Sequence, residues 1–257
     1  SVVWLILLLP LASFAIVSAI IRPFFNRSSG LAGYLTIASI TISLVLSFWT
    51  IFSVSKNSGT IESFTPHRWL AAGGLEINFG LLVDPLTAVM LIVVTSVSLI
   101  VQIYSTAYMK GDPGYSRYFA YMSLFTASMI GLILASNIVQ LYAFWELVGL
   151  SSYLLIGFWY HKPAAAAAAK KAFIITRFGD FGLLLAILYL FSNGDTFASN
   201  GLNSLDISDI NLAAKSGILA SGVISWVAIG IFAGAVGKSG QFPLHTWLPD
   251  AMEGPTP

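Results

Sequence analysis

The chain has 257 residues, of which 57% are hydrophobic and 9% are charged, and its mean hydropathy is +0.84. Soluble domains carry about 25% charged residues, so this composition excludes an ordinary water-soluble protein and indicates a chain that crosses a lipid bilayer. The net charge of +1 argues against a nucleic-acid partner, and the lack of cysteine excludes disulfides, thiolate zinc sites and iron–sulfur clusters. The sequence therefore predicts a chain with no redox centre or metal site of its own.

Seven apolar runs are close to the length of about 20 residues that a helix needs to span a membrane. Turn-forming residues separate the runs, as in KGDPGYSR and SNGDTFASNG. The prediction is an all-α polytopic membrane protein. In chain order, the expected spans are Val2–Ile21, Gly33–Val54, Asp84–Tyr108, Tyr118–Ala135, Asn137–Tyr160, Lys171–Phe191, and a last one that runs from Ser216 into residues 234–257.

The longest connector covers residues 55–83. Its segment HRWLAAGGLEINFGLLVD alternates enough between apolar and polar residues to predict a short β-hairpin outside the membrane. At the start of the chain, Ser1–Ile21 has a longer apolar run than a signal peptide and lacks a basic leader. The absence of an initiator methionine and the end at Pro257 indicate that both ends are cut.

Lysine and arginine gather in alternate connectors, and this predicts orientation because basic residues favour the cytoplasmic side of a membrane. Three lie on one side, Lys56, Arg68 and Lys215, and seven lie on the other. The side with seven is predicted to face the cytoplasm, matrix or stroma, which puts the N-terminus outside. Those seven are Arg22, Arg27, Lys110, Arg117, Lys162, Lys170 and Lys171.

Four ionisable residues belong to the apolar runs themselves: Glu146, Arg177, Asp180 and Lys238. The other nine of the eleven acidic residues lie in connectors or at helix ends. A charged group at the bilayer centre costs at least about 2.5–3.5 kcal/mol on insertion scales. Each of the four therefore needs a partner or a task.

Glu146 lies nine residues after Asn137, which is near the bilayer midplane at a rise of about 1.5 Å per residue. It is either a protonated acid hydrogen-bonded to a neighbouring helix or a carboxyl group that gains and loses a proton. We favour the second, because a site that only needs a neutral hydrogen-bonding side chain could use glutamine, which cannot ionise. Arg177 and Asp180 are three residues apart on one helix face, so they form an ion pair that is either structural or acts on nearby groups.

Lys238 follows a run, Ser216–Gly237, that is already long enough to span the membrane. It is therefore either an ordinary flanking lysine or a lysine buried at a helix break. The residues after it, SGQFPLHTWL, are still largely apolar, and helix-weakening Gly and Pro cluster around it. Transporters place ion sites at interrupted helices of this kind.

Four long motifs resemble one family of membrane proteins: FWELVGLSSYLLIGFW, AFIITRFGDFGLL, GDPGYSRYFAYMSLF and GKSGQFPLHTWLPDAMEGPTP. They are similar to the proton-translocating subunit L of NADH-quinone oxidoreductase (respiratory complex I), whose relatives are mitochondrial subunit 5 and the F subunit of the photosynthetic NDH complex. The resemblance runs from about Asp84 to Pro257, and this chain looks like an N-terminal fragment of such a subunit.

The resemblance implies an antiporter-like fold with two inverted repeats of five helices and a broken helix in each. Residues 84–257 would hold the start of the proton-channel module, and residues 1–83 would hold two preceding helices and an outer loop. Glu146 would be the half-channel partner of Lys238 on the broken helix. Arg177 and Asp180 would influence that lysine, and His245 would lie along the internal water path.

The function so implied is proton translocation by a membrane-arm subunit, coupled to electron transfer from NADH or another donor to quinone on partner subunits. Those partners would carry the redox cofactors, and the membrane would be a bacterial plasma membrane, a thylakoid or a mitochondrial inner membrane. The alternatives are the large subunit of an Mrp-type sodium/proton antiporter, the membrane arm of a hydrogenase complex and a purely structural scaffold. The stretch PDAMEGPTP favours complex I, because Mrp-type relatives tend to read PNAMEAPTP.

Overall fold

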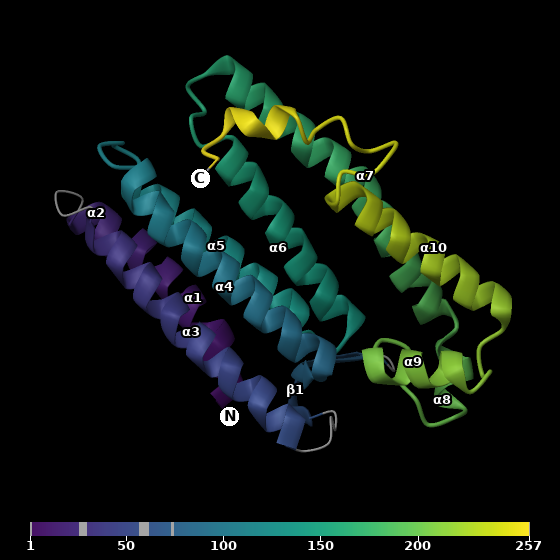
Figure 1. Cartoon of the computed structure of the whole chain (residues 1–257). Coiled ribbons are helices and arrows are strands. Elements are labelled where there is room, and N and C mark those ends of the chain that lie inside the picture. The colour runs from purple at the N-terminus through teal and green to yellow at the C-terminus, as the bar shows by residue number, and fades with distance from the viewer. Residues whose placement is uncertain (1, 26–29, 57–61, 73–74, 257) are drawn as a thin grey trace. The chain divides into compact units, whose positions relative to one another are not determined.

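The computed structural model describes residues 2–25, 30–56, 62–72 and 75–256, most of which are helical (Figure 1). Arg27, one of the predicted cytoplasmic residues, lies outside this part. Within it, six helical spans are long and apolar enough to cross a membrane, so the predicted helical polytopic fold is confirmed. They are α3 (Gly30–Lys56), α4 (Pro85–Tyr108), α6 (Ile138–Ile156), α7 (Pro163–Ser192), α10 (Ser221–Lys238), and a continuous first span made of α1 (Val2–Ile16), η1 (Val17–Ile21) and α2 (Arg22–Phe24).

The remaining predicted span is present as α5 (Tyr115–Ile133), but it is not among these six. Its sequence YSRYFAYMSLFTASMIGLI is rich in hydroxyl side chains, and most of its residues are buried by neighbouring helices. A helix enclosed by other helices needs no continuous apolar surface, because its polar groups find partners in protein rather than in lipid. The predicted number of seven lipid-compatible spans is therefore approximate.

The chain divides into two compact units. The first comprises Ser1–Phe64, Leu81–Leu134 and Pro255–Pro257, and the second comprises Thr65–Gly80 and Ala135–Gly254. In the first unit, α1, α3, α4 and α5 pack against one another. Their common core contains the fully buried side chains of Ile40, Leu91 and Phe119.

Hydroxyl groups join the helices of the first unit. The Ser98 hydroxyl of α4 lies 2.6 Å from that of Thr126 on α5, and the Ser105 hydroxyl lies 3.1 Å from that of Tyr118. Hydrogen bonds of this kind, between small side chains, hold membrane helices together at close range.

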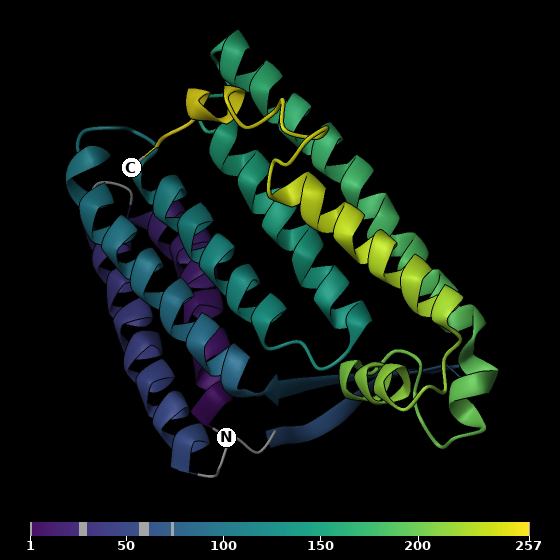
Figure 2. The ribbon, with the colours of Figure 1, turned by 45° about the vertical axis from the view of Figure 1, so that its right-hand side comes forward.

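The connector 55–83 contains the expected hairpin, because β1 (Glu62–Ala72) and β2 (Leu75–Val83) pair in a two-stranded sheet (Figure 2). Within the second unit, the end of this hairpin is tied to α6. The Gln140 side chain donates to the Gly80 carbonyl at 3.0 Å and accepts from the Gly80 amide at 3.3 Å. The start of α6 is thereby anchored to the hairpin.

The second unit is built on α6, α7 and α10, with α8 (Gly194–Ala198) and α9 (Ile207–Lys215) in the connector between α7 and α10. In both ribbon views α10 runs along α7 (Figures 1 and 2). Their backbones meet at glycines: a Cβ at Gly182 would come within 2.7 Å of the Ala233 Cβ, and one at Gly230 within 2.6 Å of the Gly182 carbonyl oxygen. Close approach at small residues is a common way for membrane helices to associate, and here it sets where the end of α10 lies on α7.

The last span was expected to run from Ser216 into residues 234–257, whereas α10 starts at Ser221 and ends at Lys238, among the predicted helix-weakening residues. Gly240 has a φ of 58°, and the Gln241 amide donates back to the Val236 carbonyl at 3.0 Å. This is a Schellman-type helix end, which needs a left-handed residue that glycine supplies without strain. Beyond it the chain forms turns and then the short η3 (Asp250–Glu253).

Candidate functional site

Three helices of the second unit bring four of the predicted residues together. Glu146 lies in the middle of α6, Arg177 and Asp180 lie in the middle of α7, and Lys238 is the last residue of α10. Their side chains are 27%, 26%, 1% and 16% exposed, respectively. All four are thus largely withdrawn from the surface of the unit.

These side chains form a row of alternating charge. Arg177 forms an ion pair with Glu146 through Nη1 and Oε2, and its Nη2 donates to the Glu146 carbonyl oxygen at 3.3 Å. The same Nη1 lies 3.5 Å from Oδ2 of Asp180, as the three-residue spacing predicted. Lys238 Nζ lies 3.7 Å from that same Oδ2. The order in space is Glu146, Arg177, Asp180, Lys238.

The pairing differs from the one that the family resemblance implied. Among the described residues, the ion-pair partner of Lys238 is Asp180, and the partner of Glu146 is Arg177. Arg177 contacts both carboxylates, and a guanidinium keeps its charge at any physiological pH. The arginine is therefore a permanent cation between two acids, and a direct Glu146–Lys238 partnership stays a prediction.

Residues that the sequence analysis did not single out complete the surroundings of the row. The Trp145 indole Nε1 donates to Oδ1 of Asp180 at 2.5 Å. The Arg177 guanidinium lies 4.4 Å from the centroid of the Phe173 ring, in a cation–π contact. Helical spacing was the available signal for Phe173, which precedes Arg177 by one turn, whereas Trp145 only adjoins Glu146 in the sequence.

Gly149 on α6 provides the space in which the two cations lie. A Cβ at this position would overlap Nζ of Lys238 and come within 3.1 Å of Nη2 of Arg177. Because Gly149 follows Glu146 by three residues, it presents this gap on the same helix face. The absence of a side chain is what lets the lysine reach the row.

The segment after Lys238 holds the end of α10 in place. The Trp247 indole donates to the Gly237 carbonyl at 3.1 Å, which satisfies one of the acceptors that a helix C-terminus leaves free. Trp247 also packs against buried alanines of α7, and Lys171 pairs with Asp250 at 2.6 Å. The segment that follows Lys238 thus packs back against α7.

His245 does not join the row in this structure. Its side chain is exposed, and its ring centroid lies 5.9 Å from that of Phe242. Its expected place on an internal water path stays a prediction. Within the described residues, no group of three or more His, Asp or Glu side chains is placed to hold a metal ion.

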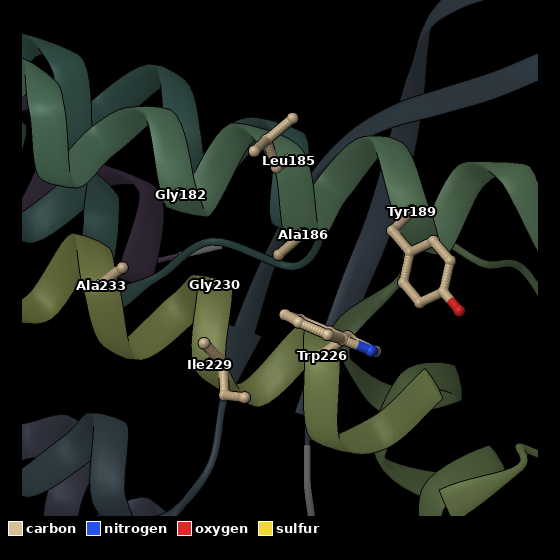
Figure 3. Close-up of a pocket in the computed structure, with 8 residues that line it drawn as sticks. All are labelled: Gly182, Leu185, Ala186, Tyr189, Trp226, Ile229, Gly230 and Ala233. Carbon is tan, nitrogen blue, oxygen red and sulfur yellow. The ribbon is translucent and has the colours of Figure 1, made fainter. Parts of the chain in front are cut away.

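A separate apolar groove of about 490 Å³ lies between α7 and α10 (Figure 3). Two of its lining residues are glycines, and its aromatic residues are exposed, Trp226 by 66% and Tyr189 by 38%. None of its lining residues is acidic or basic, so it is distinct from the charged row. The lining residues are Gly182, Leu185, Ala186, Tyr189, Trp226, Ile229, Gly230 and Ala233.

Comparison with known families matches most of this chain. Residues 69–119 match "NADH-Ubiquinone oxidoreductase (complex I), chain 5 N-terminus", and residues 135–257 match "NADH:quinone oxidoreductase/Mrp antiporter, TM". The chain belongs to the complex I chain 5 family. NAD(P)H-quinone oxidoreductase chain 5 of Synechocystis sp. is 43% identical over 257 residues, which cover 99% of this chain and 37% of the relative. The chloroplastic subunit 5 of Mesostigma viride is 44% identical over 259 residues, which cover 99% and 38%.

Solved structures show the same fold. The Mrp complex from Dietzia sp. DQ12-45-1b contains a chain that matches with a TM-score of 0.75 and 28% identity, covering 97% of this chain and 25% of that one. A chain of the archaeal membrane-bound sulfane sulfur reductase matches in fold with a TM-score of 0.72 and 20% identity, covering 97% and 47%. With six membrane-length spans in the part of the chain that the structure describes, this family member is an integral membrane protein with an antiporter-like fold. It spans a little over a third of the length of the curated relatives it matches.

Proposed function

We propose that this chain translocates protons as part of a membrane-arm subunit, and that partner subunits carry the redox cofactors and pass electrons from NADH or another donor to quinone. The observation that carries the proposal is the row Glu146–Arg177–Asp180–Lys238, held within three membrane-length helices. Ionisable groups at such depth are costly and mark proton or ion paths. The complex I chain 5 relatives support the coupling to electron transfer.

The arrangement couples two carboxylates through one cation. When Arg177 moves toward Glu146, Asp180 is left to neutralise Lys238, and the lysine holds its proton. When Arg177 moves toward Asp180, it takes over that carboxylate, and Lys238 loses part of its counter-charge and releases the proton. A guanidinium is a permanent cation, so the displacement of Arg177 would transmit a signal without consuming a proton.

The energies involved match this task. Two unit charges 3.7 Å apart, as Asp180 and Lys238 are, attract by about 4 kcal/mol at an effective dielectric constant of about 20. Moving one proton against 100 mV costs about 2.3 kcal/mol. Weakening the Asp180–Lys238 attraction by somewhat more than half would therefore supply the cost of moving one proton.

We infer that the membrane is a bacterial plasma membrane, a thylakoid or a mitochondrial inner membrane, with the N-terminus outside. The distribution of lysine and arginine supports the orientation. Because the chain has no cysteine, single cysteines at Lys110 and Lys215 can report the two sides with a membrane-impermeant maleimide. If Lys215→Cys is labelled from inside the cell or organelle, the orientation is the opposite of the one proposed.

Residues 84–257 are proposed to hold the start of the proton-channel module, after two helices and a loop in residues 1–83. The match of residues 135–257 to the antiporter-like family and the confinement of the row to residues 146–238 support a module in this later part of the chain, whereas the compact units place residues 81–134 with the first helices.

A second candidate is the large subunit of an Mrp-type sodium/proton antiporter. The TM-score of 0.75 to a chain of the Dietzia Mrp complex favours it, as does a family description that names both protein classes. The two candidates differ in what drives the proton, electron transfer in one and a sodium gradient in the other.

The deciding experiment introduces Lys238→Met into the gene that encodes this chain and uses inside-out vesicles from the native host. Lumen acidification is followed after an NADH pulse, and its collapse is followed after a sodium pulse. The matched control is Lys215→Met, because Lys215 is an exposed lysine at the end of α9 and outside the row. It is expected to behave as wild type.

Loss of NADH-driven acidification in Lys238→Met, with no sodium effect in either strain, supports the pumping subunit. Intact acidification with loss of the sodium-dependent collapse identifies an antiporter. Full retention of both activities contradicts a role for Lys238 in either function.

A further inference from the structure

Trp145 adjoins Glu146 in sequence, but its polar atom serves Asp180. The indole Nε1 of Trp145 on α6 donates to Oδ1 of Asp180 on α7 at 2.5 Å. Asp180 is 1% exposed, so this donor is one of the few groups that can stabilise the carboxylate. Hydrogen bonds to a buried ionised group are among the strong ones in proteins.

Packing holds the indole in this position. Trp145 lies against the buried cluster that includes Leu183 and Ile187 of α7. Its ring also reaches α10, where Cζ2 lies 3.6 Å from the place that a Cβ on Gly234 would occupy. The side chain therefore touches all three helices that carry the charged row.

The two oxygens of Asp180 have different partners. Oδ1 receives the indole N–H, whereas Oδ2 lies 3.5 Å from Arg177 Nη1 and 3.7 Å from Lys238 Nζ. If the carboxylate turned to offer both oxygens to one cation, it would lose the indole hydrogen bond. The neutral donor on one side thus keeps the other oxygen shared between the two cations.

We propose that Trp145 is a positioning residue: its indole N–H orients the Asp180 carboxylate so that Oδ2 faces Arg177 and Lys238 at the same time. The consequence for proton translocation rests on the proposed function, whereas the orientation of Asp180 does not. The two parts are therefore tested separately.

The orientation is tested by nitrogen-15 NMR of the indole groups in the full chain, reconstituted in lipid nanodiscs. The chain has seven tryptophans, and the Trp145 indole resonance is assigned as the one that is missing from the spectrum of Trp145→Phe. Asp180→Asn is expected to shift this resonance. The control is Asp209→Asn. The Oδ2 of Asp209, in the connector between α7 and α10, accepts from the backbone N–H of Asn203, and this change is expected to leave the Trp145 resonance unchanged. If Asp180→Asn moves no indole resonance, the inference is overturned whatever the transport activity.

The consequence is tested by a double-mutant cycle in the complete complex. Trp145→Phe keeps an aromatic ring but removes the donor, and it is expected to slow NADH-driven translocation about tenfold, the factor for one hydrogen bond to a charged group. The control Trp226→Phe changes an exposed tryptophan of α10 in the apolar groove and is expected to leave the rate unchanged. Equal amounts of assembled complex are verified in each strain.

If Trp145 acts through Asp180, then Trp145→Phe combined with Asp180→Asn is no slower than the slower single variant. Multiplicative effects would show that Trp145 acts independently of Asp180 and would overturn the positioning role. Absence of NADH-driven translocation in the wild type defeats the proposed function instead, and leaves the NMR result standing.

Discussion

The two units of the chain bury polar groups in different ways. In the first unit, the buried polar residues that the structure describes are neutral, mainly Ser and Thr, and pairs such as Ser98–Thr126 link neighbouring helices. In the second unit, the carboxylate of Asp180 is buried between two cations. Neutral hydroxyls serve helix packing at little cost, whereas buried charges are costly and need one another. The contrast separates a unit whose buried polar groups are neutral from a unit that holds a network of ion pairs.

The largest effect on stability is expected from Asp180→Ala, because it leaves Arg177 and Lys238 without their shared carboxylate. Removing one member of a buried ionic network costs about 3–5 kcal/mol. Unfolding of the purified chain in lipid nanodiscs measures it, with Glu253→Ala as a control that removes an exposed acid of η3. A cost equal to that of the control would mean that the row is not a coupled network.

Gly230→Ala is expected to cost about 1–3 kcal/mol, because its Cβ would press on the backbone of α7 at Gly182. Gly222→Ala on the same helix meets open space and is expected to stabilise by about 0.4–1 kcal/mol. The same unfolding assay compares the two. Effects of equal sign would contradict the direct contact of the α7 and α10 backbones.

A smaller change is expected in the first unit. Ser98→Ala removes one side of the hydroxyl pair with Thr126 and should lower the free energy of unfolding by about 0.6 kcal/mol, the average for such bonds between membrane helices. A loss near that of Asp180→Ala would place the hydroxyls of the first unit in the same class as the buried charges of the second.

The smallest expected effect is a pH dependence outside the membrane. Burial raises the pKa of Asp206, as does the nearby charge of Asp209, while a hydrogen bond with Asn203 acts in the opposite direction. The folded chain therefore keeps this proton to a higher pH than the unfolded chain, whose reference pKa is 3.8. Stability should fall as pH rises from about 3.8 through the folded pKa. Thermal unfolding across this range should show a weaker fall in Asp206→Asn, and an identical slope would exclude this contribution.

Local patterns in the sequence were enough to locate the long helices and the four unusual charges. The predicted span Lys171–Phe191 lies within a longer helix, because α7 already starts at Pro163, where proline suits the first turn and the alanine run is strongly helix-forming. The short α8 and α9 were missed, since helices of 5 and 9 residues depend on tertiary packing more than on propensity.

By itself, the sequence determined that this is a helical membrane protein, that helix-weakening residues surround Lys238, and that four ionisable residues belong to the apolar runs. Length, hydropathy, glycine position and charge are local properties, so they can be read along the chain. Only the tertiary structure decided that Asp180 pairs with Lys238, that Trp145 orients Asp180 and that Gly149 makes room for the lysine. Those contacts depend on how α6, α7 and α10 are rotated and how closely they approach, and no single helix encodes that.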